Sequence, residues 1–330
     1  MDIRLFLLLI SIQEYFYYTL AIIGVTANFV TNVILCRGKC GLSKNITLYL
    51  LAMAVSDLLV IAFWVVFDHI AYYYVKSLIF FPTSVCAVNN FLKSAFMDCS
   101  VWSTVVFTVD RFVAICHQGL KAKYCILKTA LAVLGTIWTV SILRSIPDYF
   151  KYEPIVTMEG RGWGCRVKMD FVRRVKWMTF DWMNQVLTPL IPYVVILLCN
   201  CLTVKHILTA SLARTRLRNQ SKADTGDPEV INRRKSIILL FSISASFILL
   251  WMPNVIYFIL DRIAKLPYSP ADFTNPLAIF LQTSNMLMLL SSCVNTFIYA
   301  LTQTKFRKQL WNGLTFPVSV IIRLVKIVKR

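Results

Sequence analysis

Apolar residues of this chain gather in long runs separated by short stretches rich in charge. A helix needs about 20 apolar residues to cross the hydrocarbon core of a bilayer, and each run meets that length. None of them shows the period-two alternation of a membrane β-strand. The pattern predicts seven transmembrane helices, over Tyr15–Cys36, Ile46–Ile70, Val85–Cys116, Leu127–Phe150, Trp177–His206, Ser236–Leu260 and Pro276–Leu301.

Composition supports the same fold class. Of the 330 residues, 58% are hydrophobic and 15% are charged, whereas a soluble domain carries about 25% charge. The net charge of +19 does not by itself indicate nucleic acid, because basic loops are ordinary on membrane proteins. We predict an all-α membrane protein, a seven-transmembrane helix bundle in a lipid bilayer, without a nucleic-acid partner. No catalytic triad or cysteine–histidine cluster is visible, so we expect neither an enzyme nor a bound cofactor.

Charge in the loops predicts the orientation. The loops after the first, third and fifth predicted helices are basic, which places them on the cytoplasmic side. The loop between the fourth and fifth helices is basic too, but the tendency of basic loops to lie on the cytoplasmic side is weaker for long loops such as this one. We expect a short extracellular N-terminus over 1–14, a seven-transmembrane domain over 15–301, and a short cytoplasmic amphipathic helix with a basic tail over 302–330.

Asp57 interrupts the second span, where a carboxylate is costly and usually functional. Its candidate partners are polar residues of three other spans, namely Asn28, Ser100, Ser291 and Asn295. Ser291, Asn295 and Tyr299 recur every four residues and therefore share one helical face. Oxygen ligands of these kinds suit a hard monovalent cation. A hydrogen-bonded polar cluster without an ion explains the pattern equally well.

The third span joins two unlike ends. At 1.5 Å per residue, the stretch from Cys86 to Arg111 rises roughly 37 Å, so a tilted helix places Cys86 outside and the pair Asp110-Arg111 inside. The pair either snorkels to anchor the helix or forms a switch, and its place opposite Cys86 favours the switch. Cys165 also falls on the outer side, where an oxidising compartment lets it pair with Cys86.

The sixth span contains Phe247, Trp251 and Pro253. The two aromatic residues are four apart and share a face, and the proline removes one backbone hydrogen bond and kinks the helix. This combination predicts a hinge that ligand contact can bias. The alternative is ordinary aromatic packing.

Taken together, these residues resemble the rhodopsin-like (class A) G-protein-coupled receptors over about residues 14–312. The motifs that carry the resemblance are Asn28, Asp57 in LAMAVSD, Cys86, Asp110-Arg111-Phe112, Trp138, Cys165, Pro192, Phe247 with Trp251 and Pro253, Asn295-Thr-Phe-Ile-Tyr299, and Phe306-Arg307. Stretches such as VDRFVAICH and NMLMLLSSCVNTFIYALT are most similar to the orphan receptors 139 and 142.

The resemblance implies a multi-pass receptor of the plasma membrane. It would bind an extracellular ligand and activate a heterotrimeric G protein by outward movement of the sixth helix, with arrestin as a further partner. Trp251 would be the toggle under the ligand. The coupling switch would comprise Asp110, Arg111, Phe112, Asn295 and Tyr299. The sodium pocket would comprise Asp57, Ser100, Ser291 and Asn295.

Three departures from the family pattern bear on coupling. Phe112 replaces the usual Tyr, and Thr296 replaces the Pro of the seventh-helix motif, so we expect a smaller kink there. Asn200 occupies the place of a Tyr that usually assists activation. The altered motif leaves open a non-coupling scavenger or accessory receptor. A transporter is a third alternative, although no half-to-half similarity supports it.

Lys93 points to the ligand class. It lies about 27 Å above Arg111 along the third helix, near the outer cavity, where amine receptors carry an acid. Lys93, with Arg144, favours a peptide or a small metabolite bearing an anionic group. Alternatively, Lys93 snorkels to the surface or pairs with Asp181. Further predicted ligand contacts are Phe96, Met97, Asn184, Asn254, Phe258, Gln282 and Asn285. No role is assigned to Asp98.

Overall fold

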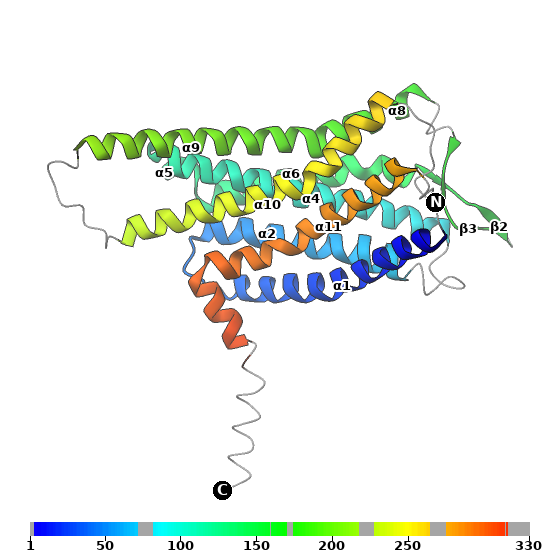
Figure 1. Cartoon of the computed structure of the whole chain (residues 1–330), viewed down its shortest axis with the longest axis horizontal. Helices are drawn as coiled ribbons and strands as arrows, with labels where there is room; N and C mark the ends of the chain where they lie inside the picture. The colour runs from blue at the N-terminus through cyan, green and yellow to red at the C-terminus, as the bar shows by residue number, and fades with distance from the viewer. Residues whose placement is uncertain are drawn as a thin grey trace, which may run out of the picture.

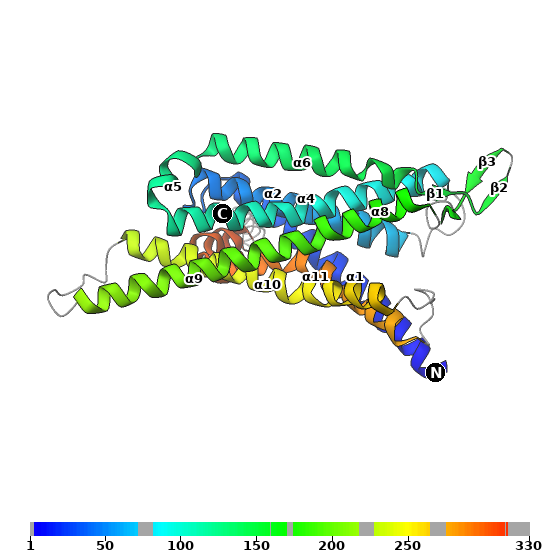
Figure 2. The same cartoon turned by 90° about the horizontal axis from the view of Figure 1, so that it is seen from above.

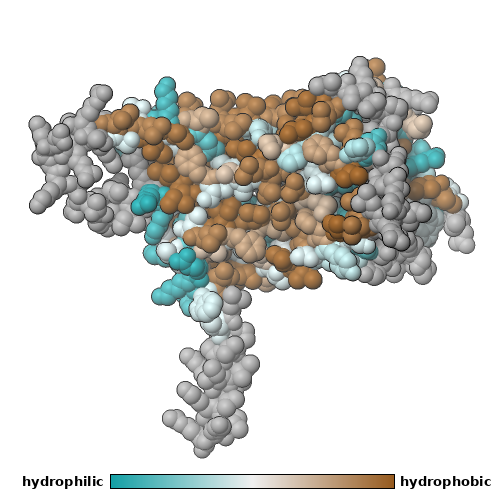
Figure 3. Space-filling model, in the orientation of Figure 1, coloured by the Kyte–Doolittle hydropathy of each residue, from teal (hydrophilic) through white to brown (hydrophobic). Residues whose placement is uncertain are grey.

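The computed structural model describes residues 3–71, 82–158, 160–169, 174–217, 228–264, 275–313 and 315. Within these ranges seven helices are long and apolar enough to cross a membrane, which confirms the predicted fold class. They run side by side as one elongated bundle (Figure 1). The face seen in Figure 3 is mainly apolar along the bundle, with polar side chains gathered toward its two ends.

The spanning segments are close to the predicted ones. Their bounds are α1 (Ile3–Cys36), α2 (Lys44–Val60) continued by η1 (Ile61–Ala71), α4 (Thr83–Cys116), α6 (Leu127–Tyr149), α8 (Val175–Gln185) continued by η2 (Val186–Leu190) and α9 (Ile191–Leu217), α10 (Pro228–Ala264), and α11 (Pro276–Thr302). Beyond Gln303 a further helix covers 304–313, where the amphipathic helix was predicted. The basic tail beyond residue 315 lies outside the described residues.

Two local features differ from expectation. The segment predicted as an N-terminal tail is helical from Ile3 and continuous with the first span, since neither Pro nor Gly interrupts residues 3–23. The fifth span is broken at η2, where Thr188 has non-helical dihedrals (φ −147°, ψ 100°). Thr188 precedes Pro189, which disfavours helical dihedrals at the preceding residue and supplies no N–H for the ladder.

The two ends of the bundle carry different short elements. One end holds two antiparallel strand pairs in the loop after α6: β1 (Tyr152–Glu153) with β4 (Arg166–Val167), and β2 (Val156–Met158) with β3 (Arg161–Trp163). In Figures 1 and 2 these strands lie at the end opposite the short helix α5 (Gln118–Tyr124). We call the strand end outer and the α5 end inner, following the predicted orientation.

The helix α4 lies at the centre of the bundle. It contacts α2, α6, α9 and α10, and 56% of its most apolar window is buried, more than in any other described span. Two apolar clusters flank it. The outer cluster includes Trp251, Met97 and Leu289, and the inner one includes Tyr299, Phe107 and Phe306. Because α4 touches both clusters, it physically joins the two ends of the bundle.

Close contacts hold α1 against α11. Gly24 faces Cys293, and a Cβ at position 24 would lie 2.5 Å from the Cys293 sulfur, closer than atoms can approach. One turn further on, the Asn28 amide donates to the Ser292 carbonyl oxygen at 2.8 Å. The Thr31 and Thr296 hydroxyls, both buried, lie 2.8 Å apart. The Thr that replaces the family proline therefore makes an interhelical hydrogen bond.

Candidate functional site

A disulfide links the outer end of α4 to the strand-bearing loop. Cys86 pairs with Cys165, with their Cα atoms 6.3 Å apart, which confirms the predicted bridge. Next to it, the Thr83 hydroxyl donates to the Gly164 carbonyl oxygen at 2.8 Å. The loop is therefore attached beside the mouth of the bundle.

Below this loop an outer cavity of about 470 Å³ opens among α4, α6, α8, α10 and α11. Six of the predicted ligand contacts line it, namely Lys93, Met97, Asn184, Asn254, Phe258 and Asn285. Two others lie elsewhere. Phe96 packs on Phe63, with ring centroids 5.5 Å apart, and Gln282 accepts a hydrogen bond from Gln13 of α1 at 3.1 Å. Helix rotation turns both side chains away from the cavity.

Lys93 is engaged in an ion pair. Its Nζ lies 2.7 Å from Asp68 Oδ2 and 5.3 Å from the centre of the Trp64 ring. Asp68 and Trp64 both belong to η1. The predicted alternative partner, Asp181, lies on α8 and also lines the cavity. The Lys93 ammonium therefore has a carboxylate partner before any ligand binds.

Asp98, which had no assigned role, connects three spans. Its carboxylate pairs with Arg144 of α6 and accepts a hydrogen bond from the Thr188 hydroxyl at 2.6 Å. Arg144 also donates to the Thr188 hydroxyl at 2.9 Å. The Asp98 side chain is only 5% exposed, so this ion pair is largely buried in the wall of the outer cavity.

Trp251 lies between the outer cavity and a smaller one beneath it. Its ring stacks on Phe247 with centroids 5.2 Å apart, and its indole N–H donates to the Ser291 hydroxyl at 3.1 Å. Pro253 lies two residues further along α10. Movement of the Trp251 ring therefore alters both the floor of the outer cavity and the polar cluster below.

That polar cluster surrounds Asp57. The Ser100 hydroxyl donates to Asp57 Oδ1 at 2.5 Å, and the Asn295 amide donates to Oδ2 at 2.8 Å. Asp57 and these predicted partners line a cavity of about 10 Å³, together with Ser291. That volume holds one water-sized particle, and its oxygen donors suit a monovalent cation. Asn28 instead bonds the α11 backbone.

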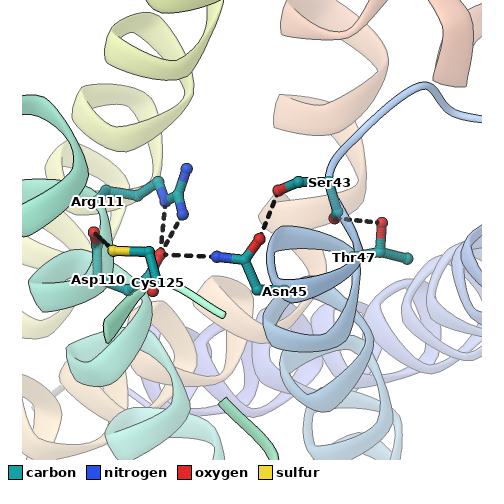
Figure 4. A network of polar contacts seen from close by, with 6 residues as sticks. All are labelled: Ser43, Asn45, Thr47, Asp110, Arg111 and Cys125. Atoms are coloured by element: carbon teal, nitrogen blue, oxygen red, sulfur yellow. Dashed lines mark hydrogen bonds and ion pairs between the residues drawn. The ribbon is translucent and has the colours of Figure 1, made fainter. Parts of the chain in front are cut away.

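At the inner end Arg111 is held by its neighbour. Its Nε lies 3.0 Å from Asp110 Oδ2, its Nη2 contacts the same oxygen, and the Asn45 amide approaches that oxygen at 3.5 Å (Figure 4). Cys125 donates to the Asp110 carbonyl oxygen at 3.6 Å, and burial raises the pKa of its thiol to about 11. Both charged side chains of the pair are only 6% exposed.

Arg111 borders an inner cavity of about 570 Å³. The cationic residues that line it are Arg111, Lys121, Lys235 and Lys305, and no acid of the described chain lines it. Of the predicted switch residues, only Arg111 is among the described residues that line it; Asp110, Phe112, Asn295 and Tyr299 are not. Phe112 contacts the His117 ring, and Tyr299 is 1% exposed and packs edge-on against Phe306.

Comparison with known proteins decides the family. Residues 27–299 match the family described as 7 transmembrane receptor (rhodopsin family). The chain belongs to this rhodopsin family of receptors. Among curated relatives, the galanin receptor type 1 of Homo sapiens is 24% identical over 87% of this chain and 76% of its own length. The galanin receptor type 1 of Rattus norvegicus is 24% identical over 86% of this chain and 77% of its own length.

Several polar partners in this receptor escaped the sequence analysis. Asp68 pairs with Lys93, Thr188 bonds Asp98, and Asn45 approaches Asp110. A second acid inside an apolar span was the available signal for Asp68, because intramembrane acids seek partners. No pattern marked Thr188, since its placement depends on the break in the fifth span.

Proposed function

We propose that this receptor acts in the plasma membrane, binds an extracellular peptide or small metabolite in the outer cavity, and activates a heterotrimeric G protein. Activation proceeds by outward movement of α10, which opens the inner cavity to the G protein. Arrestin is a further partner at the same inner surface. Family membership supports the receptor class, and the two cavities support the two binding events.

One observation carries the proposal. A single helix, α4, contributes Lys93 and Met97 to the outer cavity and Arg111 to the inner one. Between them Trp251 contacts the Asp57 cluster through Ser291. Because packed interiors resist continuous deformation, displacement of Trp251 by a ligand repacks this cluster and biases α10 between two positions.

Asp110 restrains the resting receptor. It neutralises Arg111 inside a low-dielectric site, so release of Arg111 requires a partner that replaces the lost contacts. The cationic lining of the inner cavity attracts an acidic or carboxylate-bearing segment of the partner. Asn295 and Tyr299 act from α11, through Asp57 and the inner apolar cluster, rather than by contacting Arg111.

We also propose that sodium is an allosteric ligand of the Asp57 cluster. Support comes from the carboxylate, the Ser100 and Ser291 hydroxyls, and the Asn295 amide around one small cavity. Replacing sodium by choline is expected to lower the thermal unfolding midpoint of the purified receptor, but not that of Asp57→Asn. Equal midpoints in the two salts for the unaltered receptor would contradict sodium binding.

The ligand is not transferred from the relatives. They are named for galanin, and an identity of 24% does not fix the residues that contact a ligand. We retain the orphan receptor 139 and 142 group as the proposed subfamily, supported by the VDRFVAICH and NMLMLLSSCVNTFIYALT stretches.

A second candidate is a non-coupling receptor. The Thr31–Thr296 hydrogen bond attaches the altered segment of α11 to α1, in the region that departs from the family motif. If this attachment prevents rearrangement, the receptor binds its ligand without activating a G protein.

Nucleotide exchange on purified G proteins, catalysed by the receptor in lipid nanodiscs, distinguishes the two candidates. We expect measurable exchange with at least one G-protein class and its loss in Arg111→Ala. Arg166→Ala is the matched control, because it removes an arginine from the exposed outer loop. Full exchange by Arg111→Ala would refute the mechanism, and no exchange with any class would favour the non-coupling receptor.

A further inference from the structure

The inner cavity gathers three lysines from three separate elements. Lys121 belongs to α5, Lys235 to the inner end of α10, and Lys305 to the helix over 304–313. They are far apart in the sequence, so the fold brings them to one cavity of about 570 Å³. Basic residues are frequent on the cytoplasmic side of membrane proteins, but that tendency does not direct them to a single concave site.

These lysines have no acidic counterpart in the described part of the chain. None of the three forms an ion pair or a side-chain hydrogen bond with another described residue, and no described acid lines the cavity. Arg111, the fourth cation of the lining, is by contrast neutralised by Asp110. A cleft lined by charge of one sign focuses its field and concentrates ions of the opposite sign.

Backbone packing places the Lys305 side chain against the wall of this cavity. A Cβ at Gly41 would lie 2.6 Å from both Lys305 Cδ and Nζ, so the end of the lysine lies directly on the Gly41 backbone. Gly41 has φ +66°, a conformation that favours glycine, and it lines the same cavity. The Lys305 ammonium therefore has a defined place there, which reduces the side-chain freedom that is lost on binding.

Neutral groups of the lining suit phosphate. Gln118, Ser236 and Thr304 line the cavity beside the lysines, and their side chains can donate hydrogen bonds. Each phosphate group offers several acceptor oxygens, and hydrogen bonds from ammonium groups to them are charge-assisted. At about 570 Å³ the cavity falls in the usual range for ligand sites, roughly 300–1,000 Å³, so it accommodates more than a single phosphate.

From this lining we infer that the inner cavity of the resting receptor binds a small anion that carries several phosphate groups, such as an inositol polyphosphate, held jointly by Lys121, Lys235 and Lys305. Such an anion joins α10 to α5 and to the helix over 304–313. Because activation moves α10 outward, an anion that keeps Lys235 beside the other two lysines favours the resting position and inhibits coupling. The inference rests on the proposed function, since it assigns a regulator to the same cavity.

Binding is measured first, without a G protein, in two arms that distinguish the source of the phosphates. In one arm inositol hexakisphosphate is added to the purified receptor in phosphatidylcholine nanodiscs, and in the other the nanodiscs contain phosphatidylinositol bisphosphate. The thermal unfolding midpoint is recorded at constant ionic strength. We expect a rise in midpoint in at least one arm, and none with inorganic phosphate at the same total phosphate concentration, because one phosphate cannot join three elements.

Removal of a lining lysine should weaken this binding. We expect Lys121→Ala, Lys235→Ala and Lys305→Ala each to raise the apparent dissociation constant by about tenfold, because each removes one charge-assisted contact. Lys305→Arg keeps the charge and is expected to retain binding. The midpoint of each variant without the anion shows whether it folds as the unaltered receptor does.

Neighbouring lysines of the same elements are matched controls. Lys123→Ala removes a charge from α5, and Lys308→Ala removes one from the helix over 304–313, but neither residue lines the cavity. Both are expected to bind the anion as the unaltered receptor does. No rise in midpoint in either arm, an equal rise with inorganic phosphate, or equal weakening by Lys123→Ala and Lys121→Ala would each overturn the inference.

Ligand-independent nucleotide exchange is measured separately on the same samples. We expect the anion to lower exchange by the unaltered receptor more than exchange by Lys235→Ala, since any effect on the G protein itself is common to both. Equal exchange with and without bound anion would overturn the inhibitory role. A receptor that binds the anion but drives no exchange would refute G-protein coupling and leave the anion site intact, and exchange without anion binding would do the reverse.

Discussion

The outer and inner cavities of this receptor differ in how their charges are arranged. Outer cations are matched by acids on neighbouring helices, as in Lys93 with Asp68 and Arg144 with Asp98. At the inner end Arg111 contacts an acid of its own helix, and the described residues that line the cavity include three lysines but no acid. The outer ion pairs thus join neighbouring helices, whereas the inner ion pair joins two residues of one helix.

The largest expected effect comes from breaking an outer ion pair. Arg144→Ala leaves Asp98 buried without a countercharge, so we expect a loss of about 3–5 kcal/mol in stability, measured by thermal unfolding of the purified receptor. Lys93→Ala is the matched control. Its partner Asp68 is 32% exposed, so that loss should stay near about 1 kcal/mol. Equal losses in the two variants would contradict the contrast in burial.

Breaking the inner pair should change activity more than stability. Asp110→Asn removes a charge-assisted contact worth about 1.5–3 kcal/mol, so Arg111 is released and ligand-independent nucleotide exchange rises by about ten- to a hundredfold. Asn45→Ala removes a longer contact of 3.5 Å to the same oxygen and should raise exchange much less. Unchanged basal exchange in Asp110→Asn would refute the restraint.

The connection between the two cavities is testable at Trp251. Trp251→Phe keeps an aromatic ring against Phe247 but removes the N–H bond to Ser291, worth about 1 kcal/mol, so we expect an approximately fivefold change in basal exchange. Ser291→Ala should produce the same change, and the double variant should add little to either single one. Additive effects would show that the two side chains act independently.

The smallest expected effect lies away from both cavities. Thr296→Val breaks the hydrogen bond to Thr31, and buried bonds of this kind in membrane helices contribute about 0.6 kcal/mol on average. The thermal midpoint should therefore fall slightly. The midpoint of the double variant, Thr31→Val with Thr296→Val, should fall no further. A large rise in nucleotide exchange instead would indicate that this bond restrains α11.

Sequence patterns predicted the spans, the disulfide and the location of the Asp57 cluster. They succeeded because apolar runs of this length have few alternatives in a bilayer, and because intramembrane polar residues gather toward the bundle interior. They do not specify how each helix is rotated about its axis. Phe96 and Gln282 have suitable spacing yet face Phe63 and Gln13, and these neighbours belong to other helices.

The sequence also did not specify which acidic and basic residues form ion pairs. Lys93 had more than one acid within reach along the chain, and only the packing of η1 against α4 brings Asp68 to it. Asp98 reaches Thr188 because the fifth span breaks at that residue. Both cases depend on departures from regular α-helix, which neither apolar periodicity nor residue spacing specifies.

The bare backbone at Gly24 has a consequence for how this receptor tolerates change. Because the Cys293 sulfur lies where the first side-chain carbon would stand, even alanine requires the Cys293 side chain or its helix to shift. In a saturation mutagenesis of surface expression, substitutions at position 24 should lower expression, and should do so less when position 293 simultaneously becomes smaller.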